Sequence, residues 1–153
     1  MTPAHSRPDY IVDASVALKW YVQRGESDVK KAFLLLEAQG RGRCVLRAPD
    51  LLLWEVANAL TLGRRLRPAE VSEALTHLRG LELDLNAVQW STLQSAVEIA
   101  SAADATVYDA YYLALALESG GVLVTSDEKF LGKARRYPGI VSLSQLQLPD
   151  LLP

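Results

Sequence analysis

The chain has 153 residues, of which 50% are hydrophobic, and a formal net charge of −2. One domain of this length buries a full hydrophobic core, and the single cysteine, Cys44, excludes an internal disulfide and suits a reducing cytoplasm. Residues 1–9 are polar and lack an apolar stretch of the signal-peptide type, and no apolar run is long enough to cross a bilayer. We therefore expect a cytoplasmic protein that does not enter a membrane.

Predicted strands and helices alternate along the chain, which is typical of a parallel β-sheet covered by α-helices. In chain order, we expect strands at residues 10–12, 44–47, 81–85, 122–125 and 140–143. We expect helices at residues 15–22, 51–62, 108–118 and 128–135. Three further helices are expected: one runs from Val29 to Gly40, one begins at Pro68, and one contains Leu93 and Ala100. Asp50 and Thr106 are placed to cap the helices that follow them.

Four acidic residues lie beside segments that should be buried: Asp13, Glu55, Asp109 and Asp127. Asp13 and Asp127 each follow an expected strand. Asp109 opens a helix, and Glu55 lies about one turn into another helix. In open parallel sheets, ligands bind beyond the carboxyl ends of the strands, at the topological switch point. We therefore expect these distant segments to bring their acids to one edge of the sheet.

A cluster of four carboxylates is unfavourable unless protons or a cation neutralise it. Two unit charges about 4 Å apart repel by roughly 4 kcal/mol at an effective dielectric constant of about 20. With oxygen ligands at neutral pH, the favoured cation is Mg²⁺ or Mn²⁺. The sequence thus favours metal-dependent phosphoryl chemistry. A net charge of −2 is unusual for a protein that contacts phosphates, because such proteins usually carry a basic excess. A bound cation would offset part of this negative charge.

Four segments resemble, in order and spacing, the PIN-domain ribonucleases, and among them the VapC-type toxins of toxin–antitoxin modules. The segments are Tyr-Ile-Val-Asp-Ala-Ser-Val-Ala-Leu-Lys-Trp (10–20), Ala-Pro-Asp-Leu-Leu-Leu-Trp-Glu-Val-Ala-Asn-Ala-Leu (48–60), Tyr-Asp-Ala-Tyr-Tyr-Leu-Ala-Leu-Ala (108–116) and Leu-Val-Thr-Ser-Asp-Glu-Lys-Phe-Leu (123–131). One such segment alone would be weak support, but four in the same order are specific.

The resemblance implies an α/β fold with a single PIN-like domain, a five-stranded parallel sheet flanked by helices. We expect this domain at residues 10–143, between a flexible N-terminus (1–9) and a C-terminal tail (144–153) that is loosely held from Leu146 onward. The residues implied to bind metal and to act in catalysis are Asp13, Glu55, Asp109 and Asp127, and the residues implied to support them are Thr125 and Ser15.

The resemblance also implies an activity and partners. The expected reaction is hydrolysis of RNA phosphodiesters by water bound to Mg²⁺ or Mn²⁺, which leaves 5′-phosphate and 3′-hydroxyl ends. The expected protein partners are a cognate antitoxin and a second copy of the chain in a homodimer. The sequence does not say which RNA is cut, or whether one or two ions act.

Each of these residues also has a simpler structural interpretation. Asp13 could be the N-cap of the helix that follows it, and Asp127 lies in an ordinary capping arrangement. Asp109 could be an acid that the helix dipole places in a first turn. Glu55 could be a solvated residue at the edge of an apolar stripe. The two hydroxyl residues are explained equally well as local caps or as parts of the site.

Basic and aromatic side chains give weaker signals. Three groups of basic residues could contact phosphates, although solvated faces are the commoner explanation: Arg41, Arg43, Arg47, Arg64, Arg65, Arg67, Lys129, Lys133, Arg135 and Arg136. The aromatic residues on helical stripes fit a core or a subunit interface better than base stacking: Trp20, Tyr21, Trp54, Tyr111 and Tyr112. With only His5 and His77, neither a Ser-His-Asp triad nor a zinc site is supported.

Two other functions stay open. Asp13 lies where a phosphatase with an aspartyl nucleophile would carry that nucleophile. Such enzymes generally require a second acid two residues later, where this chain has Ser15. Alternatively, the fold could serve as a catalytically silent PIN-like binding module. Four like charges held together disfavour that alternative, because they are unfavourable without a cation.

Overall fold

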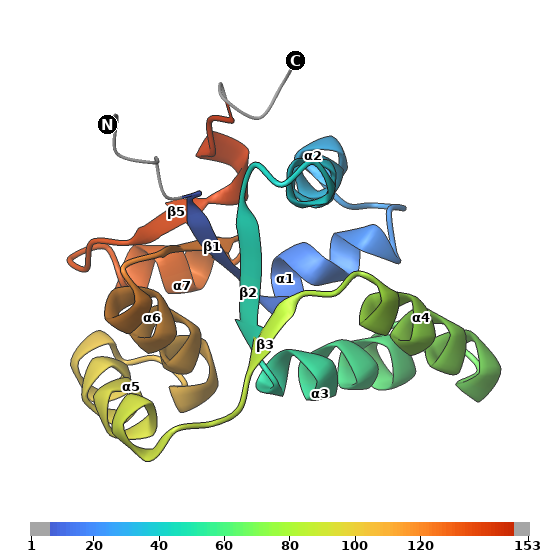
Figure 1. Cartoon of the computed structure of the whole chain (residues 1–153). Helices are drawn as coiled ribbons and strands as arrows, with labels where there is room; N and C mark the ends of the chain where they lie inside the picture. Colours follow the sequence, from blue (N-terminus) through green and yellow to red (C-terminus); the bar gives the residue numbers. More distant parts are fainter. Residues whose placement is uncertain (1–6, 149–153) are drawn as a thin grey trace, which may run out of the picture.

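The computed structural model describes residues 7–148, in which five parallel strands form one sheet (Figure 1). The strands are β1 (Asp9–Val12), β2 (Val45–Pro49), β3 (Asp84–Asn86), β4 (Val122–Thr125) and β5 (Ile140–Ser142). Their order across the sheet is β3-β2-β1-β4-β5, and each neighbouring pair is parallel. The predicted five-stranded parallel sheet is therefore confirmed.

Helices connect these strands. They are α1 (Ala14–Ala17), α2 (Val29–Gly40), α3 (Leu51–Asn58), α4 (Pro68–Gly80), α5 (Trp90–Ala103), α6 (Val107–Ser119) and α7 (Glu128–Lys133). Shorter pieces are the 3₁₀ turns η1 (Leu18–Trp20) and η3 (Leu143–Gln145), and the π-helical turn η2 (Ala59–Gly63). The α1–η1 pair matches the predicted helix 15–22, and α3 with η2 matches 51–62. Pro68 opens α4 as predicted.

The structure corrects some predicted caps and ends. Thr106 caps α6 as predicted, because its hydroxyl accepts the Asp109 amide at 3.1 Å. The capping role predicted for Asp50 is wrong: its backbone is already helical, with φ −60° and ψ −19°, and its side chain accepts no bond from the first turn of α3. β3 begins at Asp84 rather than at residue 81, because Glu82 adopts the left-handed conformation that breaks the extended backbone, with φ 52°.

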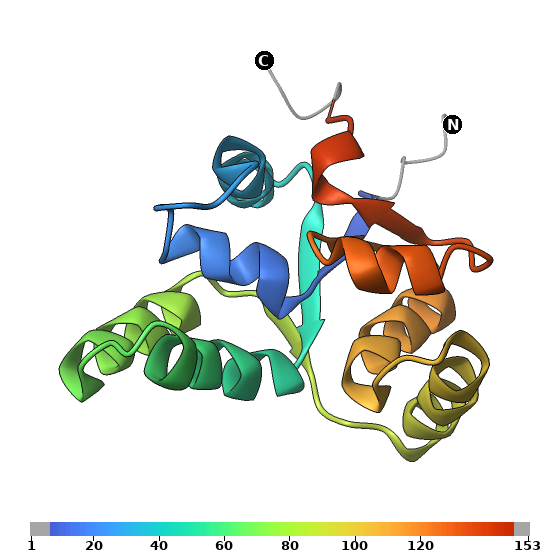
Figure 2. The same cartoon turned by 180° about the vertical axis from the view of Figure 1, so that it is seen from behind.

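Helices cover both sides of the sheet. Helix α6 rests on β1, β2 and β4, and α5 packs against the outside of α6, whereas α1 and α2 lie on the other side (Figures 1 and 2). Because both faces are covered, the central strands are continuous apolar runs rather than alternating ones. Their inner residues Ile11, Val12, Leu123 and Val124 are each 0% exposed.

The sheet has a topological switch point between β1 and β4. From β1 the chain steps outward to β2 and β3, and the connection through α5 and α6 then returns it to β4, on the other side of β1. Val12 pairs with Val124, so the carboxyl ends of β1 and β4 lie side by side. Asp13 follows Val12, and Thr125 follows Val124. The fold therefore places both residues where open parallel sheets bind ligands.

Gly121, immediately before β4, is a position where a side chain does not fit. A Cβ there would lie 2.7 Å from Cδ1 of Ile11 and 2.9 Å from the carbonyl oxygen of Asp9. We expect Gly121→Ala to lower the free energy of unfolding by about 1–3 kcal/mol, the usual cost of overpacking, as measured by urea denaturation. Gly80→Ala is the control, because no heavy atom lies within 4 Å of its added Cβ. Equal stability of the two variants would contradict this account of Gly121.

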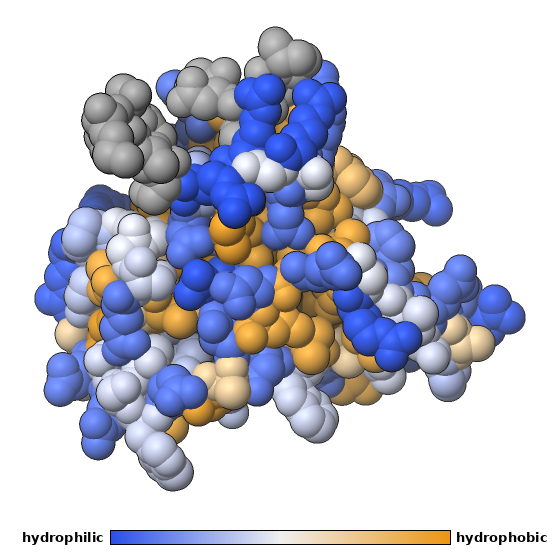
Figure 3. All heavy atoms as spheres, viewed as in Figure 1, coloured by the Kyte–Doolittle hydropathy of each residue, from blue (hydrophilic) through white to orange (hydrophobic). Residues whose placement is uncertain are grey.

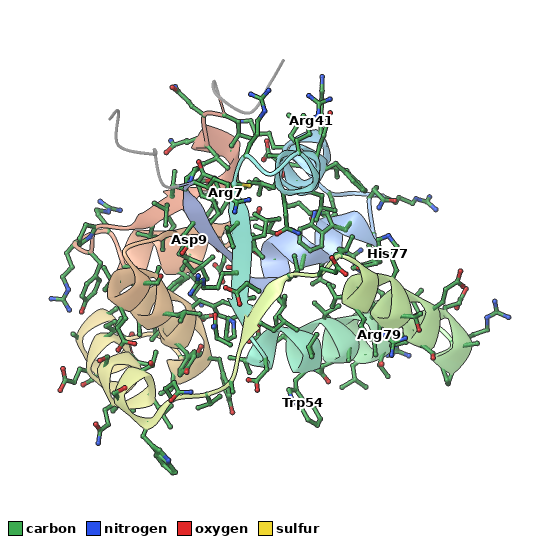
Figure 4. The ribbon with its side chains drawn as sticks, in the orientation of Figure 1. Arg7, Asp9, Arg41, Trp54, His77 and Arg79 are labelled. Atoms are coloured by element: carbon green, nitrogen blue, oxygen red, sulfur yellow. The ribbon has the colours of Figure 1, made fainter. Side chains whose placement is uncertain are left out.

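An apolar groove of about 500 Å³ lies between α3, α4 and β3. Its apolar lining comes mainly from Leu53, Trp54, Leu75, Leu78, Leu83 and Leu85. Figure 3 shows hydrophobic residues gathered over β3 on this face, and in Figure 4 Trp54 points away from α3. Trp54 is 77% exposed. Of the aromatic residues expected in a core or a subunit interface, Trp20, Tyr111 and Tyr112 are buried in the core, whereas Trp54 is exposed beside this groove.

The C-terminal part of the described chain is packed. Leu146 and Leu148 are buried in the core, so the loosely held tail expected from Leu146 onward is packed as far as Leu148. Residues 149–153, and residues 1–6 of the predicted flexible N-terminus, lie outside the described residues. Within residues 7–148, no helix combines the length and the apolar character that crossing a membrane requires.

Candidate active site at the carboxyl edge of the sheet

Asp13, at the carboxyl end of β1, is held by hydroxyl groups from two segments. Its Oδ1 accepts the Ser15 hydroxyl at 2.5 Å and the Val16 amide at 3.2 Å. Its Oδ2 accepts the hydroxyl of Thr125, at the end of β4, at 2.5 Å. Asp13 therefore caps α1, as its simpler interpretation proposed, and it also lies at the switch point.

Ser15 and Thr125 connect the end of β1 to the turn after β4. The Ser15 hydroxyl accepts the Ser126 amide at 2.8 Å, and its oxygen lies 3.4 Å from the Thr125 hydroxyl. The Thr125 hydroxyl accepts the Asp127 amide at 3.0 Å. The two predicted supporting residues thus position both Asp13 and the turn that carries Asp127.

Glu55 approaches the same edge from the interior of α3. The hydroxyl of Tyr112, on α6, donates a hydrogen bond to Glu55 Oε2 at 2.8 Å. Tyr112 is 1% exposed, whereas Glu55 is partly exposed. This bond therefore joins the buried side of α6 to the open edge of the site.

Asp109 and Asp127 line a hollow of about 230 Å³ between α6 and α7. Thr106 donates its hydroxyl to Asp109 Oδ2 at 2.8 Å. The Asp127 carboxylate caps α7. Lys129 and Lys133 also line the hollow, so it contains both carboxylates and ammonium groups.

Burial and mutual repulsion raise the pKa of three of these carboxyl groups. The pKa of Asp13 rises from 3.8 to about 6, mainly because burial disfavours the charged form, and repulsion by Asp109 adds to this rise. Burial also raises the pKa of Glu55, and the charges of Asp13 and Asp109 raise it further. The pKa of Asp109 is raised by burial and then by the charge of Asp127.

These repulsions link the four predicted acids in pairs. Asp109 acts on Asp13 and Glu55, and Asp127 acts on Asp109. The acids come from the ends of β1 and β4, from α3 and from the first turn of α6. Four segments that are distant in sequence therefore meet at one edge of the sheet.

The chemistry of the donor set suits a hard divalent cation, because the side chains that meet here offer carboxylate and hydroxyl oxygens. In the arrangement of residues 7–148, no three carboxylate, imidazole or thiol groups converge closely enough to enclose an ion. Burial is the largest cause of the raised pKa values of Asp13, Glu55 and Asp109, and a nearby cation would act in the opposite direction. Ser126 Oγ is also buried here without a hydrogen-bond partner. The donors fit a cation, although a closed coordination shell requires side-chain adjustment.

Two contributions to the site were not recognised in the sequence. The sequence pattern places Tyr112 in a core or a subunit interface, but it also follows Asp109 by three positions, and residues so spaced share a helix face. The sequence pattern groups Lys133 with the other basic residues and does not connect it to the acidic site. It lines the hollow and opposes the rise of the Asp109 pKa, and its ammonium lies 3.8 Å from the carboxylate of Asp104.

The fold and the site together define a class of protein, an all-parallel α/β domain with an acidic centre at the switch point of its sheet. The sequence model of the PIN domain family matches residues 10–136 of the chain. The chain therefore belongs to the PIN domain family. The family resemblance of the four sequence segments is thus confirmed.

Individual relatives agree with this assignment. The chain is 33% identical over 136 residues to Ribonuclease VapC3 of Pyrobaculum aerophilum, an alignment that covers 86% of this chain and 97% of that protein. It is 26% identical to the solved structure of PAE2754 from Pyrobaculum aerophilum, with a TM-score of 0.63 and coverage of 91% and 92%. A chain of a toxin–antitoxin complex from Klebsiella pneumoniae shares the fold at 14% identity, with a TM-score of 0.60 and coverage of 90% and 99%.

Proposed function

We propose that this chain is a divalent-metal-dependent endoribonuclease and the toxin of a type II toxin–antitoxin pair. The observation that carries the proposal is the set of carboxylates at the carboxyl edge of the sheet, in which Asp109 repels Asp13 and Glu55, and Asp127 repels Asp109. Membership of the PIN domain family, and similarity to a protein named Ribonuclease VapC3, support RNA as the substrate. We place this activity in the cytoplasm, where RNA is available.

In this proposal Asp13, Glu55, Asp109 and Asp127 hold Mg²⁺ or Mn²⁺. When bound, the ion supplies an activated water and stabilises charge on the phosphoryl oxygens. The chain itself orients Asp13, because Ser15 and Thr125 donate hydrogen bonds to its two carboxylate oxygens. No protein nucleophile is needed, and the expected products carry 5′-phosphate and 3′-hydroxyl ends.

The contact between Ser15 and Asp13 argues against an aspartyl phosphatase. Ser15 stands where that mechanism needs a second acid, and it instead donates a hydrogen bond to Asp13 at 2.5 Å. A carboxylate whose two oxygens both accept hydroxyl hydrogen bonds is a weakened nucleophile. This supports water, rather than Asp13, as the attacking group.

Cleavage of RNA by the purified protein tests the proposal. We expect cleavage in Mg²⁺ or Mn²⁺, no cleavage in EDTA, and recovery when the metal is restored. Ligation-based mapping of the product ends should find 5′-phosphates. Equal activity in EDTA, or ends with cyclic phosphates, would contradict the proposed chemistry.

We propose that Lys129 contacts an RNA phosphate beside the cleaved bond. It is exposed and lines the hollow that holds Asp109 and Asp127, whereas Lys133 already donates to the Asp104 carbonyl. Lys129→Gln should raise KM and reduce the magnitude of the salt dependence of log KM by about 1, with kcat nearly unchanged. Steady-state cleavage over a series of salt concentrations measures this change.

The control for this prediction removes the same charge elsewhere. Lys30→Gln alters an exposed residue on α2, outside the site. We expect it to keep the salt dependence of the unmodified protein. Identical salt dependence in the Lys129 and Lys30 variants would reject the phosphate contact.

We further propose a cognate antitoxin and a homodimer as the protein partners. Similarity of fold to a chain of a toxin–antitoxin complex supports the first of them. The apolar groove beside Trp54 supports a protein partner in general, because exposed apolar surface of this kind marks interaction sites. Light scattering of the isolated chain tests the dimer, and co-expression with a candidate antitoxin tests the second partner.

A further inference from the structure

We infer that Tyr112 is a positioning residue of the acidic centre, and that its hydroxyl holds the Glu55 carboxylate where a divalent cation can bind it. The inference rests on the metal-dependent function proposed above and extends it to a residue outside the four acids. The contact that carries it is the hydrogen bond from the Tyr112 hydroxyl to Glu55 Oε2 at 2.8 Å, between residues 57 positions apart.

Glu55 is held differently from the other acids. Asp13 and Asp127 cap the helices that follow them, and each accepts a backbone amide. Asp109 is bonded to a hydroxyl within its own turn. Glu55 lies inside α3, where the nearby amides bond within the helix, and in residues 7–148 the only hydrogen bond to its side chain comes from Tyr112. Because Glu has a long and flexible side chain, this bond selects one of its many orientations.

Tyr112 is itself fixed in place. It is 1% exposed and lies on α6, which packs against the three central strands. Its hydroxyl donates to the Glu55 carboxylate, which can only accept. The buried Tyr112 hydroxyl thus determines the position of the flexible Glu55 side chain at the carboxyl edge of the sheet.

Tyr111 provides a matched comparison on the same helix. It is 4% exposed, and its hydroxyl accepts the amide of Gln89, before α5, at 3.0 Å. Neighbouring residues of an α-helix point about 100° apart, so the two hydroxyls serve different parts of the structure. Replacing either tyrosine by phenylalanine removes one buried hydroxyl, but only Tyr112→Phe releases an acid of the site.

Mn²⁺ binding to the metal-free protein tests the inference, with free Mn²⁺ measured by electron paramagnetic resonance. We expect about tenfold weaker binding for Tyr112→Phe, as is typical when a metal ligand loses its outer hydrogen-bond partner, and unchanged binding for Tyr111→Phe. Binding is measured below the lowest melting transition of the proteins compared, so that all are folded. The Mn²⁺ concentration for half-maximal RNA cleavage should rise by the same factor in Tyr112→Phe. Excess Mn²⁺ should then restore its rate, which a general structural defect would not allow.

The outcomes separate this inference from the proposed function. Unchanged Mn²⁺ affinity in Tyr112→Phe would overturn the inference and leave the nuclease proposal intact. Equal losses in both tyrosine variants would also overturn it, because they would show a general loosening of α6. A wild-type protein that neither binds Mn²⁺ nor cleaves RNA would refute the proposed function, and the inference with it.

Discussion

Asp13→Asn should abolish RNA cleavage and, at the same time, make the metal-free protein more stable at pH 8. The amide keeps the shape of the carboxylate, and its oxygen can still accept the bonds from Ser15 and Val16. It removes the negative charge that a cation requires, so we expect cleavage to fall by about a thousandfold or more.

The gain in stability follows from the pKa of Asp13, which the fold raises from 3.8 to about 6. A group with a raised pKa contributes stability that is present below its unfolded value and is lost as the pH rises through its folded value. Ionised Asp13 therefore costs the folded state up to about 3 kcal/mol above pH 6. Asn carries no such charge, so its advantage should appear at pH 8 and be absent at pH 3.5.

Urea denaturation in EDTA at the two pH values measures this difference. Asp104→Asn is the matched control, because Asp104 is exposed and its left-handed backbone, with φ 51°, suits Asn well. The control should leave both cleavage and stability nearly unchanged. An Asp13→Asn protein that still cleaves RNA, or that is less stable than the wild type at pH 8, would contradict this account of Asp13.

Mn²⁺ should raise the melting temperature of the wild-type protein at pH 8 and lose this effect at pH 5. The raised pKa values of Asp13, Glu55 and Asp109 mean that protons occupy the proposed ligands in the acidic range, with that of Asp13 about 6. An ion present at about 100 times its Kd stabilises the folded state by about 2.7 kcal/mol. For a chain of this size that corresponds to about 5–10 °C, which differential scanning fluorimetry resolves.

Two comparisons make the metal prediction specific. Asp13→Asn should show little or no Mn²⁺ effect at pH 8, because it lacks one of the ligands. Ca²⁺ should shift the melting temperature less than Mn²⁺ does, because a larger ion favours more ligands at longer distances. A melting temperature that rises equally in the wild type and in Asp13→Asn would place the ion elsewhere on the protein.

The sequence predicted the sheet well because its strands are short apolar runs between helical patterns. Val122–Thr125 and Tyr10–Val12 lie in the middle of the parallel sheet, and burial on both faces leaves a continuous apolar signature. The edge strand β3 was placed too early. Two of its residues are exposed, so alternation in residues 81–85 did not distinguish the end of α4 from the start of the strand.

Residue type predicted one of the two helix caps correctly, that of Thr106, and the other, that of Asp50, wrongly. Thr106 precedes a helix in extended backbone, with ψ 151°, and its hydroxyl can reach the Asp109 amide. Asp50 precedes a helix as well, but its backbone has already turned into the helical region, where an Asx cap cannot form. Residue type alone does not separate these cases, because the difference lies in how the preceding strand enters the helix.

The site was partly predictable for a different reason. Asp13 and Asp127 follow strands, so the rule that ligands bind at the carboxyl ends of parallel strands predicted their meeting. The contribution of Tyr112 depends on how α6 packs beside α3, a tertiary relation that neither segment encodes alone. The hydrogen bond from Thr125 to Asp13 likewise joins residues 112 positions apart and depends on the pairing of β1 with β4.

A crystal structure of the protein with Mn²⁺, analysed by anomalous scattering, tests the central claim most directly. The account predicts an anomalous peak at the carboxyl edge of the sheet, bound by carboxylate oxygens that include those of Asp13 and Asp109. Absence of the peak at saturating Mn²⁺, or a peak bound only by residues outside this edge, would contradict the claim that these four acids form a metal centre.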